Sequence, residues 1–247
     1  FGDIGFLGIT YPESYGGLNL DLFYMVILLE ELQKIKSSGF TAAMWAHAYL
    51  AMTHLNAEGD ERIKQDYLAP SIAGKKIGAL CITEPFGGSD VAGMRTNAIK
   101  KGDKYIINGS KTFITNGVYA DYYVVAAKTD PAFGNKGISI FLMDTSSKGI
   151  SATKLDKLGW RASDTAEIAF DNVEVPFENL MGEENKGFAG SGVLSTGKNN
   201  GGGKIDVGGI VNLLTPQEKA ALAKKHEATM QQQAAEKAKV VDVVVKH

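Results

Sequence analysis

Small hydroxyl side chains and glycines gather in one short run of this chain, directly after a strand-like segment. Thr83, the Gly87-Gly88 pair and Ser89 all lie within residues 81–93. Glycine has no Cβ, so backbone N–H groups and small hydroxyls can approach a planar or phosphorylated ligand closely. The run therefore predicts a binding loop, with an ordinary Pro-Gly turn as the alternative.

A second segment, residues 111–117, ends a strand-like run with an aromatic ring, a hydroxyl and a tight turn. Phe113 can stack on a planar ring while Thr115 offers a donor or acceptor to the edge of that ring. This arrangement suits a heteroaromatic cofactor. The alternative is a Phe buried in a core and a Thr chosen for its strand propensity.

Composition bounds the class of protein. At 247 residues, the chain is long enough for one large or two modest domains. The 26 Lys and Arg nearly balance the 28 Asp and Glu, which argues against a nucleic-acid partner. No signal peptide or 18-residue apolar span is present, so we expect a soluble chain without membrane insertion. The first residue is Phe1 rather than Met, so we expect a truncated N-terminus.

The pattern of residues predicts an α+β fold in three parts. Residues 1–76 form a helical domain, in which Leu22, Val26, Leu29 and Leu32 recur at helical spacing and Asp60 begins a further helix. Residues 77–188 form an antiparallel β-barrel domain, because short β-rich runs alternate with turn signals such as Asn108-Gly109 and Asp171-Asn172. Residues 189–247 contain a Gly-rich linker and a short helical tail.

Four motifs, in this order, give the chain a resemblance to the acyl-CoA dehydrogenase family. Residues 8–17 resemble the entry to the family's helical domain, and residues 82–93 resemble its first signature. Residues 111–117 resemble its flavin-stacking strand, and residues 157–188 resemble the close of its β domain. The resemblance covers residues 1–188.

The resemblance implies that FAD is the cofactor and that the β domain holds most of it. Thr83 matches a residue that bonds the pyrimidine side of the flavin, Thr115 one near N5, and Ser89 one near the pyrophosphate that also touches the acyl-CoA substrate. The expected cofactor-binding residues are Leu80, Cys81, Ile82, Thr83, Gly88, Ser89, Phe113, Ile114 and Thr115. No metal is expected, because His47 and His54 have no third ligand at suitable spacing.

The activity that the resemblance implies is the α,β-dehydrogenation of an acyl-CoA, with electrons passed to an electron-transfer flavoprotein. The family's catalytic glutamate lies in a C-terminal helical bundle that residues 189–247 do not match, so no catalytic base is named. Glu84 is expected to cap local backbone, and Asp164 and Glu167 to be solvated turn residues. The alternatives are a non-catalytic flavin- or CoA-binding remnant and an acyl-CoA oxidase-like flavoprotein.

The remaining expectations concern the setting of the protein. The single cysteine, Cys81, excludes an internal disulfide and fits a reducing compartment, which we take to be the cytoplasm or the mitochondrial matrix. Members of the family are homotetramers, an assembly that is doubtful for a chain without the bundle. Their roles lie in β-oxidation of fatty acids or in branched-chain amino acid catabolism.

Overall fold

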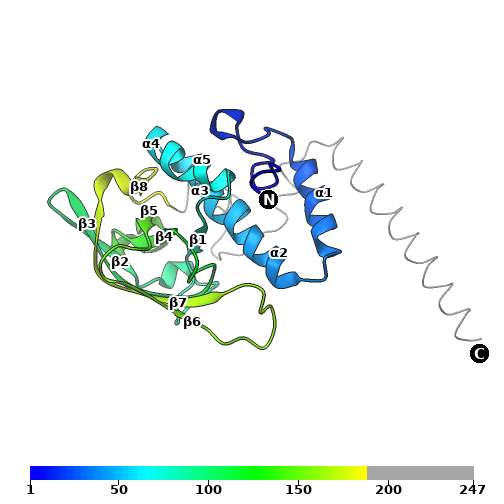
Figure 1. The fold of residues 1–247 in the computed structure, drawn as a ribbon. Helices are drawn as coiled ribbons and strands as arrows, with labels where there is room; N and C mark the ends of the chain where they lie inside the picture. Colours follow the sequence, from blue (N-terminus) through cyan, green and yellow to red (C-terminus); the bar gives the residue numbers. More distant parts are fainter. Residues whose placement is uncertain (188–247) are drawn as a thin grey trace, which may run out of the picture. The chain divides into compact units, whose positions relative to one another are not determined.

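Residues 1–187 are described by a computed structural model of the protein, in which helices come first and strands follow (Figure 1). The predicted linker and tail helix lie outside the described residues. The helical elements before the first strand are η1 Glu13–Tyr15, α1 Leu22–Gln33, α2 Ser38–Trp45, the π-helical η2 Ala46–Ala51, α3 Met52–Glu58, α4 Glu61–Ile63, the π-helical η3 Lys64–Leu68 and α5 Ala69–Ile72.

Two aspartates set the starts of helices. The Asp21 carboxylate accepts a hydrogen bond from the Phe23 N–H at 2.8 Å before α1, and Asp60 accepts one from the Ile63 N–H at 2.8 Å before α4. The first N–H groups of a helix have no partner within the helix, so these carboxylates satisfy donors that would otherwise be unpaired. The predicted helix start at Asp60 is confirmed.

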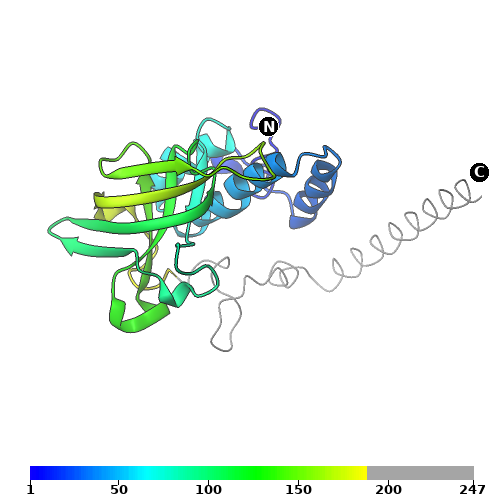
Figure 2. The same ribbon diagram turned by 90° about the horizontal axis from the view of Figure 1, so that it is seen from below.

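Eight strands form one sheet, in the order β6-β7-β3-β2-β4-β5-β8, with β1 paired to β4. Figure 2 shows the long strands β3 and β7 side by side, as their antiparallel register requires. The strands are β1 Gly78–Cys81, β2 Asn97–Lys101, β3 Lys104–Thr115, β4 Tyr122–Lys128, β5 Ile138–Asp144, β6 Ile150–Lys154, β7 Thr165–Pro176 and β8 Leu180–Met181.

The expected antiparallel barrel is wrong in two respects, although the α+β order is correct. The sheet is open: β6 pairs with β7 and β8 pairs with β5, and these two end strands do not pair with each other. In addition, β1 runs parallel to β4. Evenly spaced strands with turn signals indicate a sheet, but they do not indicate whether its first and last strands meet.

Two expected turns are irregular points within long strands. Asn108-Gly109 lies inside β3, where the β3–β7 register shifts between Ile107 and Gly109. Gly109 has φ +147°, and a Cβ there would come within 2.5 Å of Thr96 Oγ1, so only glycine fits. Asn172 lies inside β7 with φ +50°. Glycine and asparagine mark bulges as readily as turns, which explains the misreading.

The central strands β4 and β5 are buried on both faces. Alternate residues of β4, Tyr122, Val124 and Ala126, pack in a core with the helices. The residues between them, Tyr123, Val125 and Ala127, pack in a second core with residues of β3 and β7. A strand buried on both faces reads as a continuous apolar run, as β4 and β5 do.

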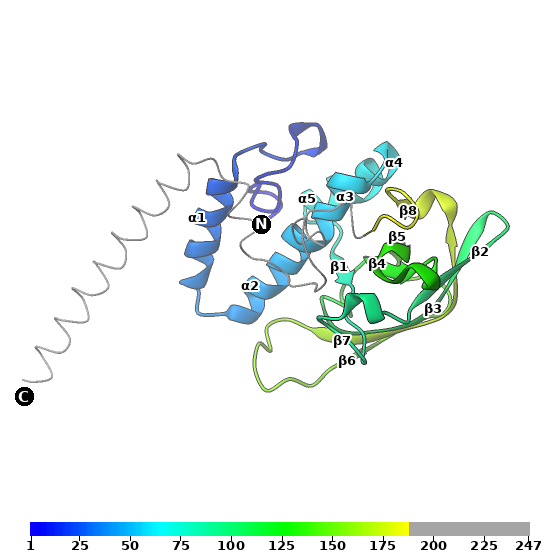
Figure 3. The same cartoon turned by 180° about the vertical axis from the view of Figure 1, so that it is seen from behind.

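The strand β1 lies between the helices and β4, as the view from behind shows (Figure 3). Its neighbour on the helical side is η2, and its residues pair with Tyr122 to Val125 of β4. The short strand therefore receives support from both sides at the point where the chain leaves it for the predicted binding loop.

Candidate functional site

Glu84 anchors the loop that follows β1. Its Oε2 accepts a hydrogen bond from the Arg95 N–H at 2.6 Å, and its Oε1 accepts one from the Thr96 N–H at 2.9 Å. Within the loop, the main chains of Glu84 and Gly87 exchange two hydrogen bonds. One buried carboxylate thus ties the start of the loop, residues 82–96, to its end. The expectation that Glu84 caps local backbone is confirmed.

Lys111 of β3 supplies the opposite charge beneath this loop. Its Nζ donates to Glu84 Oε1 at 2.9 Å and to the carbonyl oxygen of Ile82 at 3.0 Å. The Lys111 side chain is fully buried and that of Glu84 is 5% exposed. The role of Lys111 was not predicted from the sequence, although a lysine at an inward position of a strand could have indicated a buried ion pair.

Burial and the opposite charge act against each other on both members of this pair. Burial by itself raises the pKa of the Glu84 carboxyl, but the Lys111 ammonium and the donors at Thr96 and Arg95 outweigh burial and hold that pKa below its usual value. Burial lowers the pKa of Lys111, and the Glu84 charge opposes that effect. Lys111 Nζ donates to both the carboxylate and a carbonyl oxygen, two acceptors that favour the ammonium form.

Phe113 stands out from the core at the end of β3. The β3–β7 register passes from Lys111↔Ile168 to Ile114↔Ala166, so two residues of β3 oppose one residue of β7 in a β-bulge. Phe113 has φ +58° and is 69% exposed. The alternative of a core Phe is therefore wrong. An exposed aromatic held in the left-handed region is a pattern of functional sites, because the strain costs on the order of 1–3 kcal/mol.

The Thr83 loop and the end of β3 lie against each other. The Thr112 N–H donates to the Thr83 carbonyl oxygen at 2.9 Å. Thr115 follows three residues later on the same strand, roughly 10 Å further along an extended chain. Both threonines are half-buried, so each is partly open to solvent. The two hydroxyl-bearing segments that the sequence singled out are thus neighbours.

The other predicted site residues fall into two groups. The side chains of Cys81 and Ile114 are buried in the second core, and burial raises the pKa of the Cys81 thiol far above its ordinary value. These two residues can line a ligand only through their main chain. Leu80 and Ile82 are half-buried on the opposite side of the chain, where they pack against the helical core.

Gly88 and Ser89 lie in the exposed middle of the loop, just before the 3₁₀ turn η4 Val91–Gly93. The Asp90 carboxylate accepts a hydrogen bond from the Gly93 N–H at 3.0 Å and thereby caps this turn. Asp90 thus has a local structural use, whereas Gly88 and the Ser89 hydroxyl are open to a ligand.

Among the other carboxylates, Asp164 differs from expectation. It is 2% exposed and accepts a hydrogen bond from the Val118 N–H at 2.6 Å, so it is a buried cap and not a solvated turn residue. Glu167 is exposed, as expected, but it lies within β7 and not in a turn.

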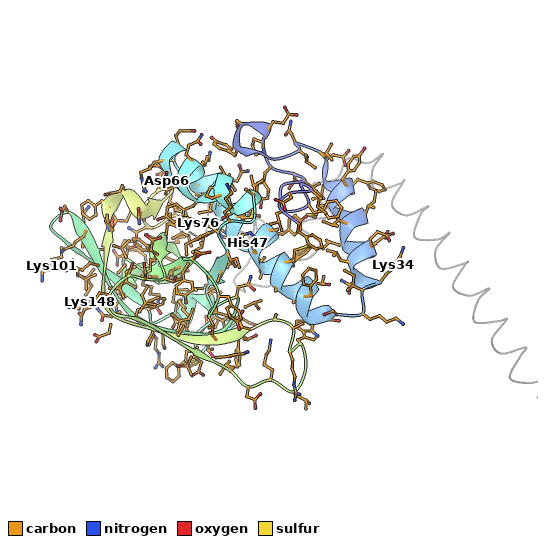
Figure 4. The ribbon with its side chains drawn as sticks, viewed as in Figure 1. Lys34, His47, Asp66, Lys76, Lys101 and Lys148 are labelled. Carbon is orange, nitrogen blue, oxygen red and sulfur yellow. The ribbon has the colours of Figure 1, made fainter. Side chains whose placement is uncertain are left out.

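Both ring nitrogens of His47 are likewise used in contacts with the backbone. It lies between the helices and β1 (Figure 4), where its Nδ1 accepts from the Gly78 N–H at 3.0 Å and its Nε2 contacts the Ser71 carbonyl oxygen at 3.3 Å. Within residues 1–187, no group of three or more metal-ligating side chains occurs.

Comparison with known proteins identifies the family. The family description "Acyl-CoA dehydrogenase, N-terminal domain" matches residues 1–75, and "Acyl-CoA dehydrogenase, middle domain" matches residues 79–173. The chain therefore belongs to the acyl-CoA dehydrogenase family. The two descriptions meet near the change from helices to strands.

Three relatives illustrate the similarity. The short-chain specific acyl-CoA dehydrogenase of Clostridium acetobutylicum is 45% identical over 189 residues, which are 76% of this chain and 49% of that protein. The mitochondrial isovaleryl-CoA dehydrogenase of Oryza sativa is 44% identical over 75% of this chain and 46% of its own length. The solved structure of an FAD-dependent dehydrogenase has a TM-score of 0.73 at 34% identity, and the match covers 75% of this chain and 51% of that one.

The chain spans about half the length of the curated relatives that it matches. In the part of the chain that the structure describes, no helix has the length and apolar character needed to cross a membrane.

Proposed function

We propose that this chain carries the FAD-binding and part of the acyl-CoA-binding surface of an enzyme that dehydrogenates acyl-CoA thioesters between the α and β carbons. The observation that carries the proposal is the 2.9 Å hydrogen bond from the Thr112 N–H to the Thr83 carbonyl oxygen, because it joins the two segments expected to hold the flavin. Membership of the acyl-CoA dehydrogenase family supports the reaction class.

The residues present fit a flavin. An exposed aromatic at Phe113 offers a ring face for stacking, and the partly exposed Thr83 and Thr115 offer hydroxyls to the edge of a planar ligand. When bound, FAD supplies the acceptor for the hydride that leaves the β carbon. The chain's own part is to orient the ring through Phe113, to bond its edge through the two threonines, and to meet the pyrophosphate and substrate at Ser89. Gly88 lets the backbone approach closely there.

The remaining proposals extend from the family. Residues 1–76 act as the helical domain and residues 77–188 as the FAD-binding domain. The electron acceptor is an electron-transfer flavoprotein, and the setting is the cytoplasm or mitochondrial matrix. The relatives named for short-chain and isovaleryl substrates favour fatty acid or branched-chain amino acid catabolism. We name no catalytic base among residues 1–187, since Glu84 and Asp164 are occupied as buried caps.

An absorption spectrum of the purified chain with added FAD, followed by anaerobic addition of butyryl-CoA or isovaleryl-CoA, tests the proposal. We expect flavin bands near about 370 and 450 nm to remain with the protein after gel filtration. We expect little or no bleaching by acyl-CoA, because we name no catalytic base among residues 1–187. Failure to retain FAD contradicts the proposed binding function, and bleaching at roughly 1 per second or faster contradicts the expected lack of turnover.

A binding-only role is the second candidate. The structural uses of Glu84 and Asp164 favour it, because both carboxylates are occupied by backbone donors. The same spectra distinguish the two roles in a protein completed by a helical bundle: bleaching there supports catalysis and persistent yellow colour supports binding alone. An oxidase-like protein is recognised by hydrogen peroxide release in air.

A further inference from the structure

Lys157 holds a charge close to the proposed flavin edge. Its Nζ donates to the Thr165 hydroxyl at 2.9 Å and to the Ser163 hydroxyl at 3.2 Å. Lys157 lies in the segment between β6 and β7, residues 155–164, and its side chain is half-buried. Two hydroxyls that accept from one ammonium fix its position more firmly than a solvated surface lysine would be fixed.

The partner hydroxyl stands directly opposite Thr115. Thr115 and Thr165 are paired residues of β3 and β7, so their side chains lie on the same face of the sheet. The residues beside them, Ile114 and Ala166, point into the core, which places the two threonines on the outer face. Opposed residues have Cβ atoms roughly 5 Å apart, so the Lys157 ammonium lies roughly 6–9 Å from a ligand atom bonded to Thr115.

This charge is not neutralised by an ion pair. The four ion pairs found among residues 1–187 leave Lys157 out, whereas Lys111 is paired with Glu84. The acidic residues of the segment are Asp156, which is exposed, and Asp164, whose carboxylate accepts from the Val118 N–H. Glu167, two residues beyond Thr165 on the same face of β7, is exposed and accepts a hydrogen bond from the Thr112 hydroxyl at 3.4 Å. The two lysines on either side of the end of β3 thus differ: one is compensated and one is free to act on a neighbour.

We propose that Lys157 is a positioning residue whose charge increases the affinity of this site for reduced flavin more than its affinity for oxidised flavin. The proposal rests on the proposed function, since it takes the Thr115 hydroxyl to meet the flavin edge. Uptake of two electrons and one proton adds one negative charge to the ring, and an ammonium 6–9 Å away, an estimate that follows from the strand spacing, stabilises that charge. Lys157 also holds the hydroxyl of Thr165, the residue paired with Thr115.

The test compares two affinities in the full 247-residue chain. Oxidised FAD and dithionite-reduced FAD are titrated anaerobically against wild type and against Lys157→Gln, which keeps a hydrogen-bond donor but loses the charge. We expect the variant to weaken binding of reduced FAD about tenfold and of oxidised FAD by less than about twofold. The resulting five- to tenfold change in the ratio of the two affinities corresponds to a fall of about 20–30 mV in the two-electron potential of bound FAD.

Three further variants serve as controls. Lys157→Arg keeps the charge and should restore most of the preference for reduced FAD. Lys157→Met, of similar length, repeats the loss of charge should Gln disturb the fold. Lys148→Met removes an exposed lysine that precedes the other end of β6 (Figure 4) and should change neither affinity.

The outcomes that overturn the proposal are distinct from those that overturn the proposed function. If Lys157→Gln and Lys157→Met lower both affinities equally, or neither, the electrostatic role is overturned while the proposed function stands. A wild-type chain that binds no FAD at all overturns both. If Lys148→Met lowers the affinity for reduced FAD as much as Lys157→Gln does, the effect is one of overall charge, and the assignment to Lys157 is overturned.

Discussion

Two regions only a few residues apart on β3 are built in opposite ways. At Lys111 the strand points a charged side chain into the interior, where it donates to Glu84 and to the Ile82 carbonyl oxygen, and two backbone N–H groups donate to the same Glu84 carboxylate. At Phe113 a bulge turns an aromatic ring out to solvent, in a backbone conformation that L-residues rarely adopt. The motif of residues 111–117 therefore contains both a residue that holds a loop and a residue that is open to solvent.

The two regions should respond differently to substitution. Lys111 and Glu84, here called the anchor, form a buried ion pair. Removing one of them should therefore lower the free energy of unfolding. The exposed Phe113 side chain contributes little to stability, so removing it should weaken ligand binding and leave the free energy of unfolding nearly unchanged. Substitutions at Lys111, Gly117, Glu84 and Phe113 test whether the two regions differ in this way.

The largest effect is expected at Lys111. Lys111→Met leaves the buried Glu84 carboxylate without its cation, and removing one partner of a buried pair costs about 3–5 kcal/mol. Urea unfolding should show a loss of that size. The double variant Lys111→Met with Glu84→Gln should recover part of the loss, because no uncompensated charge remains. A loss below about 1 kcal/mol in the single variant would show that the pair is not an anchor.

A smaller effect is expected at Gly117, in the turn after Thr115. A Cβ at this position would come within 2.7 Å of the Ala166 Cβ and 2.9 Å of the Ile114 carbonyl oxygen. Gly117→Ala should therefore lower the free energy of unfolding by about 1–3 kcal/mol, the usual cost of overpacking. Gly102→Ala is not a suitable control because φ is +62° there, whereas at Gly159 a Cβ meets nothing within 4 Å. Gly159→Ala should be neutral, and an equal loss in both variants would contradict this account.

The anchor should also weaken in acid. The pKa of Glu84 is lower in the folded chain than in the unfolded chain, so its contribution is fully present above the unfolded value, about 4.3, and is lost as pH falls through the lower folded value. Glu84→Gln cannot titrate. The stability gap between wild type and Glu84→Gln should be constant from neutral pH to about pH 5.5 and should narrow below about 4.3. If the difference in the free energy of unfolding widened in acid, the pKa of Glu84 would be raised by folding and not lowered.

The smallest effect on folding is expected at Phe113. The side chain is 69% exposed, so Phe113→Ala should change the free energy of unfolding by no more than about 0.5 kcal/mol. Phe113→Gly should be at least as stable as Phe113→Ala, because glycine adopts φ +58° without strain. Thermal unfolding of the three proteins measures both statements. A marked loss for Phe113→Ala would mean that this ring supports the fold.

Much of the fold was readable from the sequence, and the reasons are local. The Asp60 helix start follows from a cap residue before a charged helical run, and the apolar runs of β4 and β5 follow from burial on both faces. Closure of the sheet was not readable, because it depends on whether β6 and β8 meet, which is a long-range matter. Asn108-Gly109 misled because glycine serves a bulge and a turn equally well.

The candidate site was readable in part. The motifs singled out Thr83, Phe113 and Thr115, and the structure joins their segments by a backbone hydrogen bond, while their roles toward a flavin stay predictions. The motif alone did not reveal that the side chains of Cys81 and Ile114 are buried, since a strand exposes alternate residues only. Nor did it reveal Lys111 and Lys157, whose partners lie far away in sequence or across a loop.

We propose that the Thr83 loop and the Phe113–Thr115 turn form one flavin-binding surface. Titration of the chain with FAD, followed by flavin fluorescence, tests it most directly when wild type is compared with Phe113→Ala and with Tyr24→Ala, which removes a 50% exposed aromatic from α1. Loss of one stacking partner should weaken FAD binding about tenfold or more in Phe113→Ala, since stacking of a planar ring contributes about 1–3 kcal/mol. Tyr24→Ala should bind as wild type does. Equal FAD affinity in all three proteins would contradict the account.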